Sequence, residues 1–214
     1  MSNSKTLKNV NVYCDGFNFY HAIDALKKNH LKWINYIKMA ESFLRHDEHL
    51  HKTYLFTSLT TLSSEKRVRN QCFLDAQRAV GTELVMATFK TAKKYCRKEG
   101  KYCKFKEEKG NDINIALQMV ADANDGAAHR MVLVTADTDQ IPTVEYIRTR
   151  FPDIEISLFI PPGRRNEARD LGRLFVNPVE ISEGRIEACL LPHEIKAANG
   201  KTIIIPPEYI KVPH

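Results

Sequence analysis

The stretch Met131–Val134 and the polar residues directly after it constrain the fold most. Its residues are all apolar and partly β-branched, which is typical of a strand buried on both faces. The run stops before two acidic residues, Asp137 and Asp139, and apolar residues recur at helical spacing from Ile141 onward. A buried parallel strand that leads into a helix places such carboxylates at the carboxyl edge of the sheet, where open α/β sheets bind ligands. Capping of the helix explains one aspartate, and a binding site explains both.

The same arrangement occurs near the start of the chain. Val10–Cys14 has the composition of a first buried strand, and it ends at Asp15. Asn18 falls on the first turn of the next predicted helix, where it serves equally well as an N-cap or as a functional residue. A further carboxylate, Asp112, lies in the first turn of a helix that follows Gly110, where a negative charge also suits the helix dipole.

Composition limits the class of protein. With 214 residues, 43% of them hydrophobic and 27% charged, the chain fits one sizeable soluble domain. No apolar run is long enough to cross a bilayer, and the amino terminus lacks the apolar core of a signal peptide. Five cysteines without regular spacing argue against a disulfide framework and predict a cytoplasmic location. The net charge of +6 and the isoelectric point near 9.0 favour a polyanionic partner.

Strand-like and helix-like segments alternate along the chain. Lys52–Thr57, Glu83–Ala87 and Ile154–Ile160 have the composition of strands, and Arg173–Val176 is predicted to form a short last strand. Ile203–Ile205, which precedes two prolines, predicts an appended strand or an arm. The alternation predicts an α/β protein, a three-layer α/β/α sandwich with a mainly parallel central sheet.

Lys90–Lys109 is dense in cations and has aromatic residues among them. Lysine and arginine neutralise phosphates, and aromatic faces stack on unpaired bases, so the segment favours contact with nucleic acid. A solvated surface hairpin is the alternative. Cys96 and Cys103 do not supply the four ligands of a zinc site. Two arginines that follow a predicted strand face the same sheet edge as the aspartates. The residues predicted to contact nucleic acid are Lys93, Lys94, Arg97, Lys101, Lys104, Lys109, Arg164 and Arg165.

The aspartates that follow the predicted strands suit a divalent cation. Clustered carboxylates repel one another unless a cation neutralises them, and hard oxygen ligands select Mg²⁺ or Mn²⁺. Such a site polarises a phosphodiester, activates water and stabilises the leaving oxygen. Asp122, deeper in the helix that carries Asp112, is expected to have a structural role or to support the metal ligands without contacting the ion. The acidic site and the basic composition point to the same substrate, a nucleic acid.

Four motifs occur in a fixed order: Val12–Asn18 (VYCDGFN), Glu107–Asp112 (EEKGND), Thr135–Asp139 (TADTD) with Pro142, and Phe159–Arg165 (FIPPGRR). Together they closely resemble the NYN domain family, the PIN-like nucleases related to LabA-type bacterial proteins. The resemblance covers residues 10–176 and depends on all four motifs. Asn111 departs from the pattern, because an apolar residue often stands before the helix-start aspartate.

The resemblance implies a PIN-like fold and a divalent-metal-dependent endoribonuclease that hydrolyses RNA phosphodiesters with Mg²⁺ or Mn²⁺. By the same resemblance, Asn18 orients substrate or a metal-bound water, Thr135 is the small hydroxyl residue before the acidic pair, and Lys109 approaches a phosphate. Residues 1–176 would form the nuclease domain, with a basic hairpin at about 90–109 inserted, and residues 177–214 a C-terminal extension packed on it or projecting from it. The implied metal ligands are Asp15, Asp112, Asp137 and Asp139, which with Asn18 and Thr135 are the implied catalytic residues.

Other functions fit parts of the sequence. An RNA-binding regulatory module with a structural or vestigial metal site is favoured by the basic segment. A phosphatase or Toprim-like acidic pair is disfavoured, because the pair follows a late strand and the first strand ends in Asp15 rather than in a glutamate. The expected partner is RNA, single-stranded or structured, such as tRNA or mRNA, with no membrane contact, and the exposed edge strand and C-terminal arm leave a homodimer open.

Overall fold

The fold is built on a six-stranded sheet in the order β3-β2-β1-β6-β7-β8, with every neighbouring pair parallel. The computed structural model describes residues 7–59, 63–96 and 100–211, and for residues 89–94 and 103–109 it describes the backbone alone. The strand order reverses between β1 and β6, so the topological switch point lies between these two strands. The strands are β1 (Lys8–Asp15), β2 (Glu48–Thr57), β3 (Glu83–Met86), β6 (Arg130–Val134), β7 (Glu155–Ile160) and β8 (Val179–Glu180).

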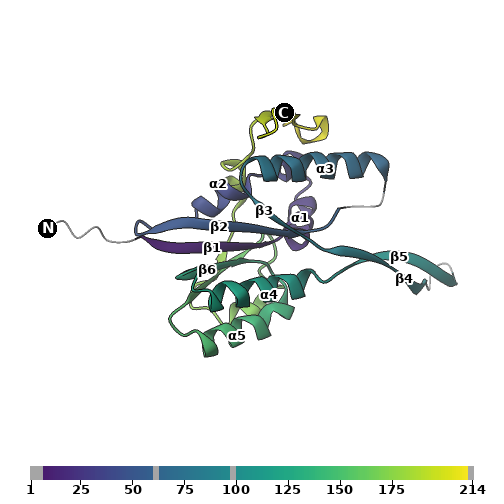
Figure 1. Ribbon diagram of the computed structural model, residues 1–214. Helices are drawn as coiled ribbons and strands as arrows, with labels where there is room; N and C mark the ends of the chain where they lie inside the picture. The colour runs from purple at the N-terminus through teal and green to yellow at the C-terminus, as the bar shows by residue number, and fades with distance from the viewer. Residues whose placement is uncertain (1–6, 60–62, 97–99, 212–214) are drawn as a thin grey trace.

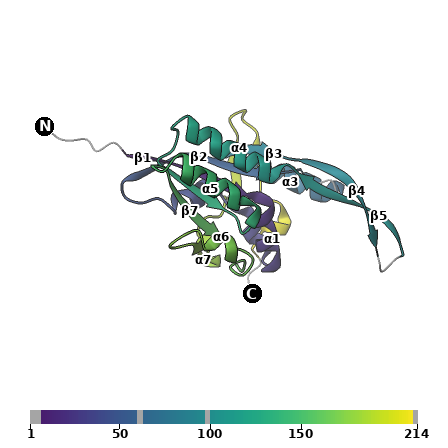
Figure 2. The same ribbon diagram turned by 90° about the horizontal axis from the view of Figure 1, so that it is seen from below.

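Helices cover both faces of the sheet (Figures 1 and 2). One face carries α1 (Gly16–Ala25), α2 (Tyr36–Glu41), α3 (Ser64–Ala79) and α7 (Glu183–Glu187), and the other carries α4 (Asn111–Asn124), α5 (Ile141–Arg150) and α6 (Arg169–Gly172). Short 3₁₀ helices are η1 (Asn29–Trp33), η2 (Thr138–Gln140) and η3 (Pro207–Tyr209). The predicted three-layer α/β/α fold with a mainly parallel sheet is therefore confirmed.

Each face of the sheet has its own apolar core. Val132 and Val134 of β6 pack with Phe19 on the α1 side, whereas Leu133 packs with Ile115 on the α4 side. Successive side chains of a strand point to opposite faces, and both faces of β6 are covered. This double burial explains why β6 is apolar at every position from Met131 to Val134 rather than at alternate ones.

A long antiparallel hairpin, β4 (Thr88–Cys96) and β5 (Lys101–Lys109), extends from the body of the protein (Figures 1 and 2). Its register runs from the pair Thr88 and Lys109 at the base to the pair Cys96 and Lys101 near the tip. The cation-rich segment therefore begins directly after β3 and ends directly before α4.

The last strand of the sheet lies at Val179–Glu180, where β8 pairs with β7, and not at Arg173–Val176 as the sequence predicted. The backbone N–H groups of residues 173–175 continue the turns of α6, because they donate to carbonyls three or four residues earlier. Apolar residues in this short segment pack as a helical turn, so a pattern of four residues was too short to separate a strand from a turn.

The C-terminal residues include a separate two-stranded antiparallel sheet, β9 (Glu194–Lys196) and β10 (Thr202–Ile204). Ile203 is thus part of an appended strand, one of the two predicted outcomes. Ile195 and Ile203 pack with Trp33 in a third apolar cluster that includes residues of α3. The helices in the described parts of the chain include none that is long and apolar enough to cross a membrane.

Candidate metal centre

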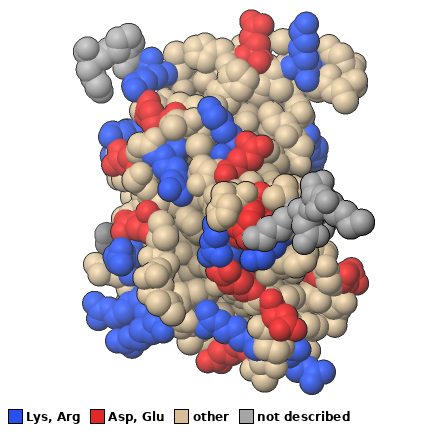
Figure 3. Space-filling model, turned by 90° about the vertical axis from the view of Figure 1, so that its left-hand side faces the viewer, with Lys and Arg blue, Asp and Glu red and all other residues tan. Residues whose placement is uncertain are grey.

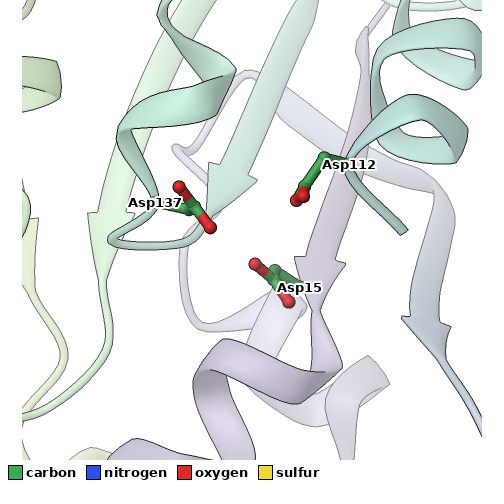
Figure 4. A group of neighbouring side chains, drawn as sticks. All are labelled: Asp15, Asp112 and Asp137. Atoms are coloured by element: carbon green, nitrogen blue, oxygen red, sulfur yellow. The ribbon is translucent and has the colours of Figure 1, made fainter. Parts of the chain in front are cut away.

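Three aspartates meet at the switch point of the sheet (Figure 4). Asp15 is the last residue of β1, Asp137 follows β6, and Asp112 lies in the first turn of α4. One carboxylate oxygen from each lies within 4.8 Å of the others. We call Asp15, Asp112 and Asp137 the acidic cluster. Asp15 and Asp137 come from the carboxyl edge of the sheet, and Asp112 comes from the start of α4, which lies at the same edge.

Asp15 is the buried member of the cluster and is held by three donors. Its Oδ1 accepts hydrogen bonds from the backbone N–H of Asn18 at 3.0 Å and from Nδ2 of Asn111 at 3.2 Å, and its Oδ2 accepts from Oγ1 of Thr135 at 2.9 Å. Burial raises the pKa of Asp15 to about 7, against the lowering effect of the hydrogen bonds from Asn18 and Thr135. A metal-free site therefore holds this carboxyl close to its midpoint of ionisation at neutral pH.

The helix after Asp15 is fixed against the neighbouring strand. Asp15 is the N-cap of α1, and Gly16 is the first residue of the helix. A Cβ on Gly16 would lie 2.7 Å from the backbone oxygen of Phe56 and 2.8 Å from Cδ1 of Leu55. Only glycine allows this close approach, and the approach sets the direction in which α1 leaves the site.

The loop that carries Asp137 is tied to the same residues. Oγ1 of Thr135 accepts a hydrogen bond from the backbone N–H of Asp137 at 3.1 Å, and Oδ1 of Asn18 accepts from the backbone N–H of Ala136 at 3.1 Å. Oδ1 of Asp137 accepts from the backbone N–H of Asp139 at 3.0 Å and so caps η2. Asn18 and Thr135 thus connect the two strand ends, which places both of these predicted residues at the site.

Asp112 is positioned by a glutamine that sequence reasoning missed. Nε2 of Gln140 lies 3.3 Å from the backbone oxygen of Asp112 and 3.5 Å from its Oδ1, and Oγ1 of Thr143 donates to Oε1 of Gln140 at 3.2 Å. Burial and the charge of Asp137 raise the pKa of Asp112. A glutamine one residue after the acidic pair has no distinctive signal in one sequence, so its role emerges only from the packing of α4 against η2.

Asp139 lies apart from the acidic cluster. Among the described residues, the group with carboxylate oxygens in mutual reach comprises Asp15, Asp112 and Asp137. The Asp139 side chain is exposed, and its charge contributes to the raised pKa of Asp112. The structure therefore gathers three of the four predicted ligands, and a ligand role for Asp139 stays a prediction.

The described residues predicted to contact nucleic acid lie in two places, in the loop after β7 and on the β4–β5 hairpin. Arg164 follows β7, where it donates to the backbone oxygen of His21 at 3.3 Å and pairs with Glu167 at 3.1 Å, and Arg165 next to it is exposed. Lys101 is exposed near the hairpin tip. On the hairpin, the backbones of Lys93, Lys94, Lys104 and Lys109 belong to β4 and β5, and Arg97 lies outside the described residues.

The side of the molecule at which β1 begins lies opposite the β4–β5 hairpin (Figure 1). Positive and negative side chains are interspersed on this side (Figure 3). Several of these charges are paired, as in Lys8 with Asp47 at 3.2 Å, and the guanidinium of Arg130 is buried against Glu48 at 2.6 Å. This side therefore carries mixed charge rather than one basic surface.

The acidic cluster fits a hard divalent cation. All its donors are carboxylate oxygens, which suit Mg²⁺, Mn²⁺ and Ca²⁺. Burial, and to a smaller extent the neighbouring carboxylates, raises the pKa values of Asp15 and Asp112, and a bound cation would favour their charged forms. The amide of Asn111 adds a second sign, because its buried Oδ1 has no hydrogen-bond partner among the described residues. An oxygen left unpartnered beside Asp15 is an additional acceptor for a hydrated cation.

Comparison with known proteins agrees with this geometry. A family model of the NYN domain matches residues 9–173, which is most of the chain. The chain belongs to the NYN domain family. The NYN domain accounts for the PIN-like nuclease fold, and the acidic cluster lies inside the matched region.

Two similar proteins add context to the NYN assignment. The chain is 33% identical over 105 residues to 6-hydroxy-3-succinoylpyridine 3-monooxygenase HspA of Pseudomonas putida (strain DSM 28022 / S16), and this match spans 48% of the chain and 32% of HspA. The crystal structure of VPA0982 from Vibrio parahaemolyticus RIMD 2210633, a protein of unknown function, has a TM-score of 0.59 at 19% identity and covers 89% of this chain and 100% of its own. The second comparison supports the fold.

Proposed function

We propose that this NYN domain protein is a divalent-metal-dependent endoribonuclease that hydrolyses RNA phosphodiester bonds. The observation that carries the proposal is the acidic cluster, three carboxylates within 4.8 Å at the switch point of a fold whose family is that of PIN-like nucleases. Asp15, Asp112 and Asp137 are the proposed cation ligands, and Mg²⁺ or Mn²⁺ is the proposed ion.

A divalent cation held here supplies Lewis-acid polarisation of a phosphodiester and a nucleophile from water at neutral pH. The protein contributes a fixed geometry. Thr135 and Asn18 hold Asp15 and the Asp137 loop in place through hydrogen bonds, and Gln140 holds Asp112. We assign Asn18 and Thr135 a positioning role in the reaction on these contacts. We keep Asp139 as a further proposed ligand, because it lies in η2 and its backbone N–H donates to Asp137.

RNA is the proposed substrate because cations and aromatic residues flank the cluster. The hairpin β4–β5 leads through Gly110 directly into α4 and Asp112, so a strand bound along it is delivered to the carboxylates. Arg164 and Arg165 follow β7 at the same edge of the sheet. We propose that the hairpin lysines and these arginines bind the phosphates on either side of the cleaved bond.

A cytoplasmic location fits this activity. Cys14, Cys72, Cys96 and Cys189 are free thiols in the described residues. Free thiols persist in a reducing compartment, where RNA substrates such as tRNA and mRNA occur.

Cleavage of a mixed-sequence single-stranded RNA tests the proposal. The parent protein is incubated with Mn²⁺, with Mg²⁺ or with EDTA, beside Asp137→Asn and the control Asp125→Asn, which alters an exposed aspartate at the end of α4. We expect the parent and Asp125→Asn to cut RNA with a divalent ion, and Asp137→Asn and the EDTA samples not to cut. Equal cutting by Asp137→Asn would refute the proposal, and RNA binding without cleavage under every ion would favour a regulatory RNA-binding module.

The similarity to HspA favours a second candidate, hydroxylation of a small aromatic compound. It covers about half of this chain and a third of HspA. The discriminating measurement is consumption of O₂ in the presence of 6-hydroxy-3-succinoylpyridine and an added two-electron reductant. Substrate-dependent consumption without RNA cleavage would replace the ribonuclease proposal, and its absence beside RNA cleavage would remove this candidate.

A further inference from the structure

The outer face of α1 carries a group of aromatic side chains. Phe17 and Tyr20 are each 46% exposed, and His21 between them is exposed as well. The ring centroids of Phe17 and His21 lie 4.3 Å apart in an edge-to-face arrangement, and those of Tyr20 and His21 lie 5.6 Å apart. Single exposed apolar residues are common and need no explanation, whereas contiguous exposed apolar side chains are a feature of binding surfaces. We call Phe17, Tyr20 and His21 the aromatic platform.

The platform is attached rigidly to the acidic cluster. Phe17 follows Asp15 by two residues, and α1 begins directly after Asp15 (Figure 4). Asn18 lies beside Phe17 and bonds both to Asp15, through its backbone, and to Ala136, through its side chain. The first turn of α1 is therefore fixed to both strand ends, so whatever binds the platform has a defined position relative to the carboxylates.

Cations border the platform on two sides. Nη2 of Arg164 donates to the backbone oxygen of His21, which brings a guanidinium from the β7 loop to the helix. Nζ of Lys32 lies 5.0 Å from the ring centroid of Tyr20 and pairs with Asp24 at 2.5 Å. Arg164 pairs with Glu167 at 3.1 Å. The exposed rings, rather than a net positive charge, therefore make this surface suited to a ligand with flat aromatic groups. The bases of a nucleotide strand are such groups.

The platform and the hairpin lie on different sides of the cluster. The hairpin joins the α4 layer, next to Asp112, whereas the platform belongs to the α1 layer on the other face of the sheet. Asp112 lies next to the hairpin at the start of α4, and Asp15 lies next to the platform at the start of α1, so an RNA strand that contacts both would pass the acidic cluster. The bound base and the phosphate at the carboxylates would then belong to neighbouring parts of one strand.

We propose that the aromatic platform stacks an unpaired base of the RNA next to the phosphate held at the acidic cluster. This proposal rests on the proposed function and deepens it, because it restricts the substrate to single-stranded RNA or to an unpaired segment. A base inside a duplex is stacked between its neighbours and does not present its face to a protein ring, whereas bases in loops and single strands do.

The test measures stacking separately from cleavage. A single-stranded RNA that contains 2-aminopurine is titrated with the 214-residue Asp137→Asn protein in Mg²⁺, and fluorescence and affinity are recorded. The comparison uses Asp137→Asn combined with Phe17→Ala, with Phe17→Trp, or with Tyr146→Ala. Tyr146 is the matched control, because it is 49% exposed and lies on α5 in the other helix layer. The melting temperature of each variant checks the fold.

Stacking on a protein ring contributes enough that its loss weakens binding by about five- to a hundredfold. We expect Phe17→Ala to show this loss and to reduce the fluorescence quenching, and Phe17→Trp and Tyr146→Ala to behave as the protein without a second substitution. If Phe17→Ala bound the RNA with the same affinity and quenching as the protein without a second substitution, the proposed stacking on the platform would be wrong. A dimer in the parent that Phe17→Ala dissociates, with RNA binding unchanged, would also overturn it and assign the surface to a second copy of the chain.

The platform and the ribonuclease proposal fail in different ways. If the parent cuts no RNA under any divalent ion but the Phe17→Ala loss of binding and quenching is found, the platform stands and the ribonuclease proposal falls. If the parent cuts RNA and Phe17→Ala leaves KM, kcat and binding unchanged, the ribonuclease proposal stands and the platform falls.

Discussion

The metal-free protein is expected to lose stability as the pH rises from 5 towards 7, and Asp15→Asn is expected to remove most of this loss. Burial raises the pKa of Asp15 from 3.8 to about 7 in the folded chain. Between these two values the folded state binds more protons than the unfolded state, so the free energy of unfolding falls as the pH increases. The slope is about 1.4 kcal/mol per pH unit in the middle of this range and becomes smaller near pH 7, where the carboxyl is half ionised, so the expected loss between pH 5 and pH 7 is about 2 kcal/mol.

The assay is urea unfolding in EDTA at pH 5, 6, 7 and 8. The parent, Asp15→Asn and the exposed control Asp125→Asn are compared, and the quantity of interest is the change with pH within each protein rather than its absolute stability. The range starts at pH 5 because Glu48, whose pKa is lowered despite burial by hydrogen bonds from Arg130 and Arg45, loses its stabilising charge only at lower pH. Parallel pH profiles for the parent and Asp15→Asn would refute the reasoning.

Three further variants test other parts of the account. Glu48→Gln leaves the buried guanidinium of Arg130 without its charged partner and should lower the free energy of unfolding, measured in urea, by about 3–5 kcal/mol. The control Glu155→Gln, at an exposed ion pair, should lower it by less than about 1 kcal/mol, and equal losses would contradict this expectation. Gly16→Ala should destabilise by about 1–3 kcal/mol through its clash with a backbone oxygen of β2, and an unchanged urea midpoint would show that the approach is not tight. Asn18→Ala should lower kcat by about 10- to 100-fold through loss of loop geometry while Mn²⁺ affinity changes little, so a loss confined to affinity would contradict a positioning role.

Much of the site could be predicted because it follows from strand ends. Asp15 and Asp137 come after buried strands, and parallel strands end at one edge, so their approach needs no knowledge of the loops. Asp112 was placed in a first helical turn, and the structure puts α4 there. Its arrival at the same edge depends on the hairpin before it and the packing of the helix, which spacing alone does not fix.

The parts that sequence reasoning missed depend on tertiary contacts. Gln140 holds Asp112 only because η2 packs against the start of α4. Asp122, in contrast, has contacts that agree with its expected structural role. Its buried carboxylate accepts hydrogen bonds from Tyr13 at 2.6 Å and from Asn11 at 2.7 Å. The strand expected at Arg173–Val176 was wrong because a four-residue apolar pattern does not distinguish a strand from the end of a helix.

Binding of Mn²⁺, followed by electron paramagnetic resonance of the free ion, tests the central claim most directly. The parent is titrated beside Asp15→Asn, Asp112→Asn, Asp137→Asn and the control Asp125→Asn. The account predicts that the parent and Asp125→Asn bind Mn²⁺ with the same affinity and that each of the three cluster variants binds it more weakly. Equal binding by all five proteins would show that the acidic cluster is not the cation site.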